Sequence, residues 1–150
     1  MDDRIETTAE AAENHALPRR HDVLAEGAPV EPEPLPSGMT RKPVAEKSLA
    51  EWAYERLILY IRNFEKQLDE EHEVAMGFTG GDAGVLRIEG MGFFDPDVVT
   101  FYGTDASGLR TQLVQHVSQL SVILRALPRH ASRTEPRRIG FRLVADLEKR

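Results

Sequence analysis

The sequence contains no cysteine. It therefore has no disulfide framework, no thiolate metal site and no cysteine nucleophile. It also lacks a long apolar run, since no stretch approaches the roughly 20 residues that a membrane-spanning helix needs. The acidic start, MDDRIETTAEAAENH, has no apolar segment of the kind found in secretory signals. We therefore expect a cytoplasmic protein without a membrane partner.

Aromatic residues are scarce as well, and residues 1–45 contain none. Four prolines lie between residues 29 and 36, in the segment AEGAPVEPEPLPSG. Such a composition cannot bury enough apolar surface to offset the entropy lost on ordering. We expect a disordered, acidic, proline- and glutamate-rich tail over residues 1–45 that contributes no large apolar side chain to the core. A single domain over residues 46–150 should follow.

Acidic and basic residues are unevenly distributed. Residues 1–39 hold nine acidic and three basic side chains, and thus account for the whole formal net charge of −6. Residues 46–105 hold thirteen acidic and five basic side chains, whereas residues 106–150 hold three acidic and nine basic ones. Asymmetry of this kind bears on association and solubility and not on fold. It favours contact between the acidic half of one copy and the basic half of another.

The first half of the domain carries clear secondary-structure signals. Ser48 and Glu51 fit a capping box, and apolar residues at three- and four-residue spacing predict a helix over residues 49–70. Period-2 runs at 74–78 and 85–89 flank a glycine-rich loop, which predicts an antiparallel hairpin. A dense β-branched and aromatic run at 98–102 predicts a third strand, covered on both faces at the centre of the sheet.

The second half is predicted from two further patterns. An apolar stripe at helical spacing predicts a helix over residues 109–127, ended by Pro128. After a polar linker, Ile139, Phe141 and Leu143 alternate with other residues and predict a final strand before a frayed end. The order α-β-β-β-α-β predicts the α+β class, as a two-layer sandwich. An antiparallel meander and a C-terminal strand would pack on two amphipathic helices.

The stretches EWAYERLILYIRNFEKQLDEEHEVAMGFTGGDAGVLRIEGMGFFDPDVVTFYG and QLVQHVSQLSVILRALP carry a resemblance to a known family. They resemble an uncharacterised bacterial domain-of-unknown-function family, the one numbered 6173, over roughly two-thirds of the chain. The resemblance implies a bacterial cytoplasmic setting and one compact domain behind a variable tail. It implies no activity, and it supplies no catalytic or binding residues.

The glycine-rich loop is one candidate ligand site. Its backbone N–H groups can face an anion, and two arginines are candidates to assist. The residues concerned are Thr79, Gly80, Gly81, Asp82, Arg87 and Arg110. However, the loop joins two strands and does not open a helix, so a plain hairpin turn is the favoured interpretation.

A run of arginines near the C-terminus is a candidate partner surface. It consists of Arg125, Arg129, Arg133, Arg137, Arg138 and Arg142. Arginines can contact phosphates, but this run has no interleaved aromatic residue, and the sequence pI is about 5.4. Nucleic acid is therefore not the favoured partner. A solvated linker, or a surface for a protein or another copy, is the preferred interpretation.

Four polar residues leave their role open between function and structure. Asp95, Asp97 and Asp105 can gather at one end of the sheet for metal or acid–base chemistry, but each also suits a turn or a helix cap. His116 lies on the apolar stripe of the predicted second helix, where a core or interface role is commoner than catalysis. A triad with Ser118 or Ser121 has little support, because neither serine lies in a nucleophile elbow. We assign no catalytic residue, metal ligand or cofactor.

Three functional hypotheses follow, in order of preference. The first is a non-enzymatic protein-binding or self-assembling module, which favours a homo-oligomer. The second is a binder of a small, nucleotide-like anion at the Gly80-Gly81 loop. The third is an enzyme that uses the three aspartates.

Overall fold

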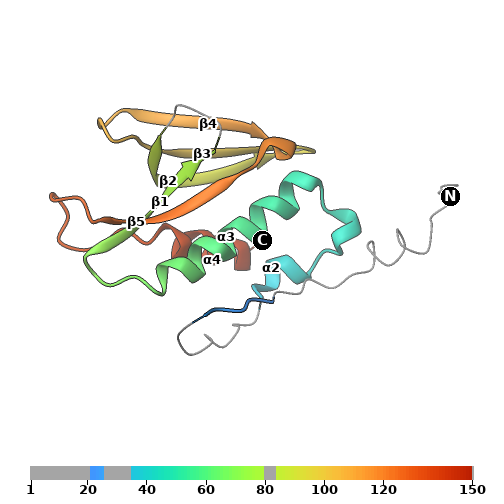
Figure 1. The fold of residues 1–150 in the computed structure, drawn as a ribbon. Helices are drawn as coiled ribbons and strands as arrows, with labels where there is room; N and C mark the ends of the chain where they lie inside the picture. Colours follow the sequence, from blue (N-terminus) through green and yellow to red (C-terminus); the bar gives the residue numbers. More distant parts are fainter. Residues whose placement is uncertain (1–20, 26–34, 80–83, 150) are drawn as a thin grey trace, which may run out of the picture.

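The computed structural model describes residues 21–25, 35–79 and 84–149, and the statements below concern those residues (Figure 1). The elements in chain order are the helix α2 (Ser37–Thr40), the 3-10 helix η1 (Val44–Glu46), the helix α3 (Leu49–Glu65), the strands β1 (His72–Phe78), β2 (Val85–Phe94), β3 (Val98–Thr104) and β4 (Arg110–His116), the 3-10 helix η2 (Val117–Gln119), the strand β5 (Val122–Pro128) and the helix α4 (Ile139–Lys149).

The five strands form one antiparallel sheet in the order β4-β3-β2-β1-β5. The helices α3 and α4 pack against each other and against one face of the sheet, beneath it in Figure 1. We call this covered side the inner face and the opposite side the outer face. The α+β class predicted from the sequence is confirmed, although the sheet has five strands instead of four.

The predicted first helix is confirmed, together with its cap. The Ser48 hydroxyl accepts a hydrogen bond from the backbone N–H of Glu51 at 3.0 Å. The helix ends at Glu65 and not at residue 70, because the following residues form turns, with the N–H of Leu68 bonded to the carbonyl of Glu65. Its apolar stripe, which includes Tyr54, is buried against the sheet.

The predicted hairpin is confirmed, but its second strand is longer than expected. The predicted run ended at residue 89, whereas strand β2 continues through Gly90 and Gly92 to Phe94. A side chain at Gly92 would collide with the Thr100 hydroxyl, and one at Gly90 would touch the Tyr102 ring. These glycines therefore make room for side chains of β3, next to the irregularity of the ladder between Ile88 and Gly90.

Strand β3 is confirmed at residues 98–104, but its predicted central, doubly covered position is wrong. The centre of the sheet is β2, and β3 lies between β2 and β4. Val99 and Phe101 are fully buried on the inner face, whereas the side chain of Tyr102 lies on the outer face and is exposed. The run of apolar residues thus serves two different surfaces.

The predicted second helix is wrong. Residues 110–116 and 122–128 form the two edge strands β4 and β5, with η2 between them. Leu113 and Leu124 face the core, while their neighbours Val114 and Ile123 are exposed, which is the alternation of a strand. Leucines at this spacing satisfy both periodicities, and pairing with β3 and β1 selects the extended one.

The predicted final strand and the frayed end are also wrong, because residues 139–149 form helix α4. Ile139, Leu143 and Leu147 are all buried, and their four-residue spacing places them on one helical face. Phe141, which fitted the strand alternation, is exposed.

The sheet must be strongly coiled, as the connection between β4 and β5 shows. His116 is level with Phe94 at the end of β2, whereas Val122 is level with the start of β2 and lies at the opposite edge. In a flat sheet these ends would be more than about 30 Å apart. The segment 117–121 reaches only about 20 Å even when extended. The sheet therefore curls around its inner face.

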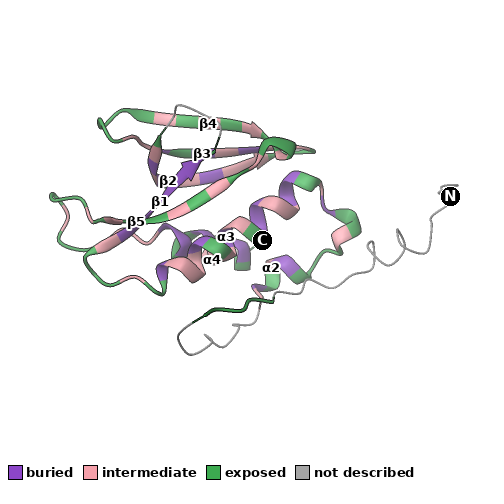
Figure 2. Cartoon of the chain, in the orientation of Figure 1, coloured by how far each residue is buried: buried purple, intermediate pink, exposed green. Residues whose placement is uncertain are grey.

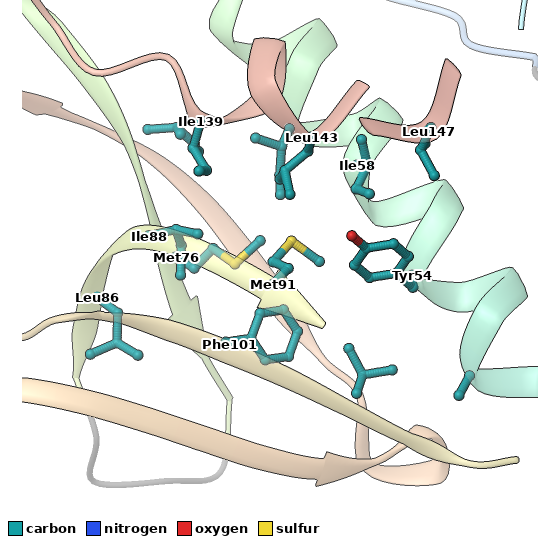
Figure 3. Close-up of a cluster of buried hydrophobic side chains, with 14 of the residues drawn as sticks. Tyr54, Ile58, Met76, Leu86, Ile88, Met91, Phe101, Ile139, Leu143 and Leu147 are labelled. Carbon is teal, nitrogen blue, oxygen red and sulfur yellow. The ribbon is translucent and has the colours of Figure 1, made fainter. Parts of the chain in front are cut away.

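The core fills this curled inner face. Figure 3 shows Met76 and Met91 between the strands and the helices, close to Tyr54 and Phe101, with Leu143 of α4 above them. Burial is concentrated on α3, α4, β1 and the inner positions of β2 and β3, while β4 is largely exposed (Figure 2). One apolar core thus joins both helices to one side of the sheet.

The predicted tail lies partly outside the described residues, but its last part packs on the domain. Met39 in α2 is 1% exposed, and its carbonyl accepts a hydrogen bond from the buried ammonium of Lys47. The same ammonium lies 2.7 Å from the Glu55 carboxylate of α3. The expectation that residues 1–45 give the core no large apolar side chain is therefore wrong at Met39.

We predict that Met39→Ala lowers the free energy of unfolding by about 2–4 kcal/mol, because it removes a fully buried side chain and leaves a cavity. Val23, which is 83% exposed, provides the control, and Val23→Ala should change stability by less than about 0.5 kcal/mol. Urea unfolding of both variants measures the difference. Equal stabilities would show that α2 does not pack on the core in solution.

Candidate functional site

The arginines near the C-terminus are largely engaged within the chain. We call residues 129–138 the arginine segment. Arg133 donates from Nε to the Glu73 carboxylate at 3.0 Å, and its Nη2 also contacts that carboxylate. The backbone N–H of Arg137 donates to the same group at 3.1 Å. The Arg87 guanidinium lies 3.5 Å from it. Glu73 is 3% exposed, so this is a buried ionic cluster.

Further contacts attach the arginine segment to the sheet and to the end of α3. The Arg137 guanidinium lies 2.9 Å from the Glu89 carboxylate. Arg138 donates to the backbone carbonyls of His72 and Asp69 at 2.7 and 2.8 Å. The segment thus binds the acidic half of its own chain, in the region where β1 and β2 diverge. Arg125 and Arg142 are exposed and Arg129 is partly buried.

The environment of Glu73 favours its charged form. Burial by itself would raise the pKa of the Glu73 carboxyl. The hydrogen bonds from Arg133 and from the backbone of Arg137 outweigh that effect, so the pKa lies below its usual range. Glu73 is therefore ionised at neutral pH, as a structural anion held by three arginine residues.

Glu65 is a second buried carboxylate, with a different environment. Glu65 is the last residue of α3, and its side chain lies against the start of α4. A side chain on Gly140 would collide with the Oε1 atom of Glu65. Burial raises the pKa of Glu65, while the backbone N–H groups of Gly140 and Phe141 act in the opposite direction. This arrangement places an acid at the positive end of a helix, which explains the residue as part of the packing of α4 on α3.

Of the proposed anion site, the structure describes Thr79, Arg87 and Arg110, and it does not bring these three side chains together. Gly80, Gly81 and Asp82 lie outside the described residues, and the Thr79 hydroxyl bonds to that of Ser121. The Arg87 guanidinium reaches toward the far end of β1, where it donates to the carbonyl of Pro128 at 2.9 Å. Arg110 begins β4, two strands away from Arg87 in the same row. Anion binding by this loop stays a prediction.

The three aspartates do not form one cluster. Asp95 accepts a hydrogen bond from the Ser48 hydroxyl at 2.5 Å, and Asp97 lies beside it in the turn between β2 and β3. Asp105 lies at the other end of β3, about 25 Å from Asp97 along the strand. Its carboxylate accepts from the backbone N–H groups of Ser107 and Leu109, and the bond from Leu109 is the main cause of its lowered pKa. These are turn contacts.

His116 connects Asp97 and Ser118 in a line of hydrogen bonds. Its Nε2 lies 3.1 Å from the Asp97 carboxylate, and its Nδ1 lies 2.7 Å from the Ser118 hydroxyl. The backbone N–H of Ser118 also donates to Nδ1 at 3.1 Å. His130 and Ser132 repeat the same local contacts in another turn. The histidine therefore caps a turn, and nothing in the line marks Ser118 as a nucleophile.

The outer face carries the most exposed apolar side chains of the sheet. Phe94 on β2 is 77% exposed, Tyr102 on β3 is 42% exposed, and Val114 on β4 is 60% exposed. The Tyr102 ring lies over Gly90 and beside Gly92. The outer face of β2, β3 and β4 is not covered by α3 or α4, because both helices lie on the inner face (Figure 1). An exposed apolar surface of this kind is typical of interaction sites.

Strand β4 also has a free edge. In the part of the chain that the structure describes, β4 pairs with β3 alone. Two hydrogen bonds lie at the two ends of the β3–β4 pair, from Asp105 N–H to Leu109 O and from Val117 N–H to Asp97 O. They determine which residues of β4 are hydrogen-bonded to β3. Because bonding alternates along an antiparallel pair, the backbone N–H groups of Arg110, Gln112, Val114 and His116 point to the free edge. The C=O groups of the first three do so as well, whereas that of His116 begins the helix η2.

The two edges of the sheet differ in protection. The centre of β4, from residue 111 to residue 115, reads TQLVQ and carries no charge and no proline. Strand β5 carries Arg125 in its centre and Pro128, which lacks an N–H, at a position where the backbone faces away from β1. Charges and prolines are the usual means of blocking an edge. The free edge of β4, together with the outer face beside it, is therefore our candidate functional site.

The sequence did not predict this site, because the segment was interpreted as a helix. Little signal was available, because only Leu113 is apolar among the half-buried positions Thr111, Leu113 and Gln115. Among the described residues, no group of three or more His, Cys, Asp or Glu side chains is arranged to hold a metal ion. No helix in the described part of the chain is both long and apolar enough to cross a membrane.

Comparison with known proteins gives one result. A family model described as a family of unknown function (DUF6173) matches residues 44–142, which span the helix α3, the whole sheet and the arginine segment. The resemblance noted from the sequence is thereby confirmed. Neither a curated protein nor a solved structure matches the chain.

We predict that Glu73→Gln lowers the free energy of unfolding at pH 7 by about 3 kcal/mol, because it leaves partly buried arginine groups without their buried anion. Since the folded-state pKa of Glu73 is lowered, its contribution exists above the unfolded-state pKa and is lost as pH falls through the folded-state value. The deficit of the variant should therefore shrink in acid. Glu70→Gln, at an exposed position, is the control, and urea unfolding at pH 7 and pH 3 is the measurement. A deficit independent of pH would contradict this electrostatic account.

Proposed function

Because the chain belongs to this family of unknown function, which assigns no activity, we propose a function from the geometry of the sheet. The domain is a non-enzymatic protein-binding module that accepts an extended protein segment as an additional strand beside β4. The observation that carries this proposal is the free edge of β4, with four residues whose backbone groups face outward and a centre without charge. Strand addition to an exposed sheet edge is a recurrent mode of peptide recognition.

The outer face supplies side-chain contacts for the added strand. A segment that pairs with β4 would place alternate side chains on the outer face, next to Val114 and near Tyr102. Backbone hydrogen bonds would then provide affinity, and these apolar neighbours would provide selectivity for β-branched or aromatic residues. The partner class is thus a protein segment with alternating apolar residues.

The other two hypotheses receive less support from the described residues. The enzyme hypothesis required Asp95, Asp97 and Asp105 to meet, and the length of β3 separates Asp105 from the other two. The anion hypothesis required Arg87 beside the glycine-rich loop, and its guanidinium contacts Glu73 instead. A cytoplasmic location in a bacterium stays a prediction of the sequence.

We predict that extended peptides selected from a displayed random library on the full chain will bind wild-type protein and lose at least about tenfold in affinity against Gln112→Pro. Proline removes an N–H that faces the free edge, while the ladder to β3 stays intact. Ala126→Pro removes the equivalent outward N–H from β5 and should not change peptide affinity. Fluorescence anisotropy measures binding.

Hydrogen exchange tests the same proposal at single residues. Bound peptide should slow exchange of the Gln112 and Val114 amides, which face outward, and leave those of Thr111 and Leu113 unchanged because β3 already protects them. Equal affinity of both proline variants, or peptide protection confined to another part of the chain, would overturn strand addition at β4.

A further inference from the structure

The free edge of β4 has opposite charge character at its two ends. Arg110 lies at its start, with its side chain exposed. At its end, His116 is bonded through Nε2 to the carboxylate of Asp97. The residues between Arg110 and His116 are uncharged. An edge of this kind is complementary to its own reversed copy, because antiparallel pairing brings the cationic end of one strand to the carboxylate at the end of the other.

The register of such a pair follows from the outward-facing residues. Pairing centred beside Leu113 sets Arg110 against the second copy's His116, and Gln112 against the second copy's Val114. The two pairs of Gln112 with Val114 exchange two hydrogen bonds each. The two pairs of Arg110 with His116 exchange one each, because the His116 carbonyl begins η2, so about six bonds form in all. A shift of two residues in either direction leaves one outward-facing residue of each copy without a partner. The centred register is therefore preferred.

We propose that the strand bound by β4 is the β4 strand of a second copy of this chain. Two copies pair antiparallel about a two-fold axis beside Leu113 and form a continuous ten-stranded sheet. This inference rests on the proposed function, since it names the occupant of the same edge. A closed two-fold dimer is the commonest form of symmetric assembly.

This pairing also buries apolar side chains on the outer face. In the centred register, the Val114 side chains of the two copies are diagonal neighbours, about 7 Å apart. Each is flanked by Gln112 of the other copy, and the outer faces that carry Tyr102 and Phe94 become one continuous surface. Val114, which is exposed in the single chain, thereby loses exposed area.

The other edge does not offer the same partner. Two β5 strands paired about their centre would bring their Arg125 side chains close together on the outer face, where like charges repel. The outward-facing Pro128 would also leave the opposing carbonyl without a donor. Pairing of β4 with β5 of another copy would use different surfaces on each chain, and so would give rings or filaments instead of a dimer.

Sedimentation and light scattering of the full chain at tens of micromolar test the oligomeric state. Wild-type protein should be a dimer, Gln112→Pro and Val114→Lys should be monomers, and Ala126→Pro should remain a dimer. Circular dichroism confirms that each variant is folded. A monomeric wild type, a ring or filament, or a dimer that survives both β4 substitutions would overturn self-pairing. A monomeric wild type whose selected peptides are still lost in Gln112→Pro would leave strand addition intact, so the two failures are distinguishable.

Cross-linking tests the register itself, against the background of a chain without cysteine. The double variant Gln112→Cys, Val114→Cys places a thiol opposite a thiol twice across the axis, at a Cα separation near 5.5 Å that a disulfide can bridge. Mild oxidation should convert it to covalent dimer, whereas each single variant should remain largely uncrosslinked. Equal cross-linking of the single and double variants, or none in the double variant, would contradict the centred register.

Discussion

Most of this structure depends on the fact that β2 pairs with β1 and with β3 over different parts of its length. It pairs with β1 only near its start, at residues 85–87, and with β3 from Arg87 to its end at Phe94, across a bulge near Gly90. Beyond Arg87 the strand β1 diverges from β2, so the sheet curls and its edges approach one another closely enough for the short connection through η2. The same divergence leaves Glu73 of β1 and Glu89 of β2 without a partner across the β1–β2 pair, and the arginine segment contacts both carboxylates. Curvature, the core and the ionic cluster are thus consequences of one pairing pattern.

Local sequence signals were sufficient where the pattern fits only one kind of secondary structure. The Ser48 cap, the stripe of α3 and the glycine-rich hairpin each predicted the observed element. Residues 109–127 had two solutions, because leucine and glutamine suit helices while the same apolar positions also alternate with period two. The choice was made by β1 and β3, whose open sides β5 and β4 fill, and β5 pairs with a strand more than 40 residues earlier. The helix α4 was missed for the same reason: Ile139, Phe141 and Leu143 fit a strand until Leu147 is included.

The candidate site was harder to predict than the fold. The sequence showed that the acidic and basic halves of the domain carry opposite charge, but it could not show that they meet within one chain. Arg133 reaches Glu73 and Arg137 reaches Glu89 across 60 and 48 residues of sequence. A charge pattern gives the sign of an attraction and leaves the partner open. The free edge of β4 carries no charge between Arg110 and His116, and it becomes visible only when the strand order is known.

These two features belong together. Because the arginine segment is bound to the carboxylates of its own chain, the strongest charges of the domain are already neutralised and partly buried. Long-range electrostatic attraction is then a weak means of recruiting a partner, since exposed pairs that remain are screened by salt. Backbone hydrogen bonds along the uncharged centre of the edge are short-ranged and directional, and they do not depend on ionic strength in the same way. Interaction through β4 should therefore be selective for an extended strand of matching register, with a salt dependence limited to the charged ends at Arg110 and Asp97, which is less than the arginine-rich sequence by itself suggests.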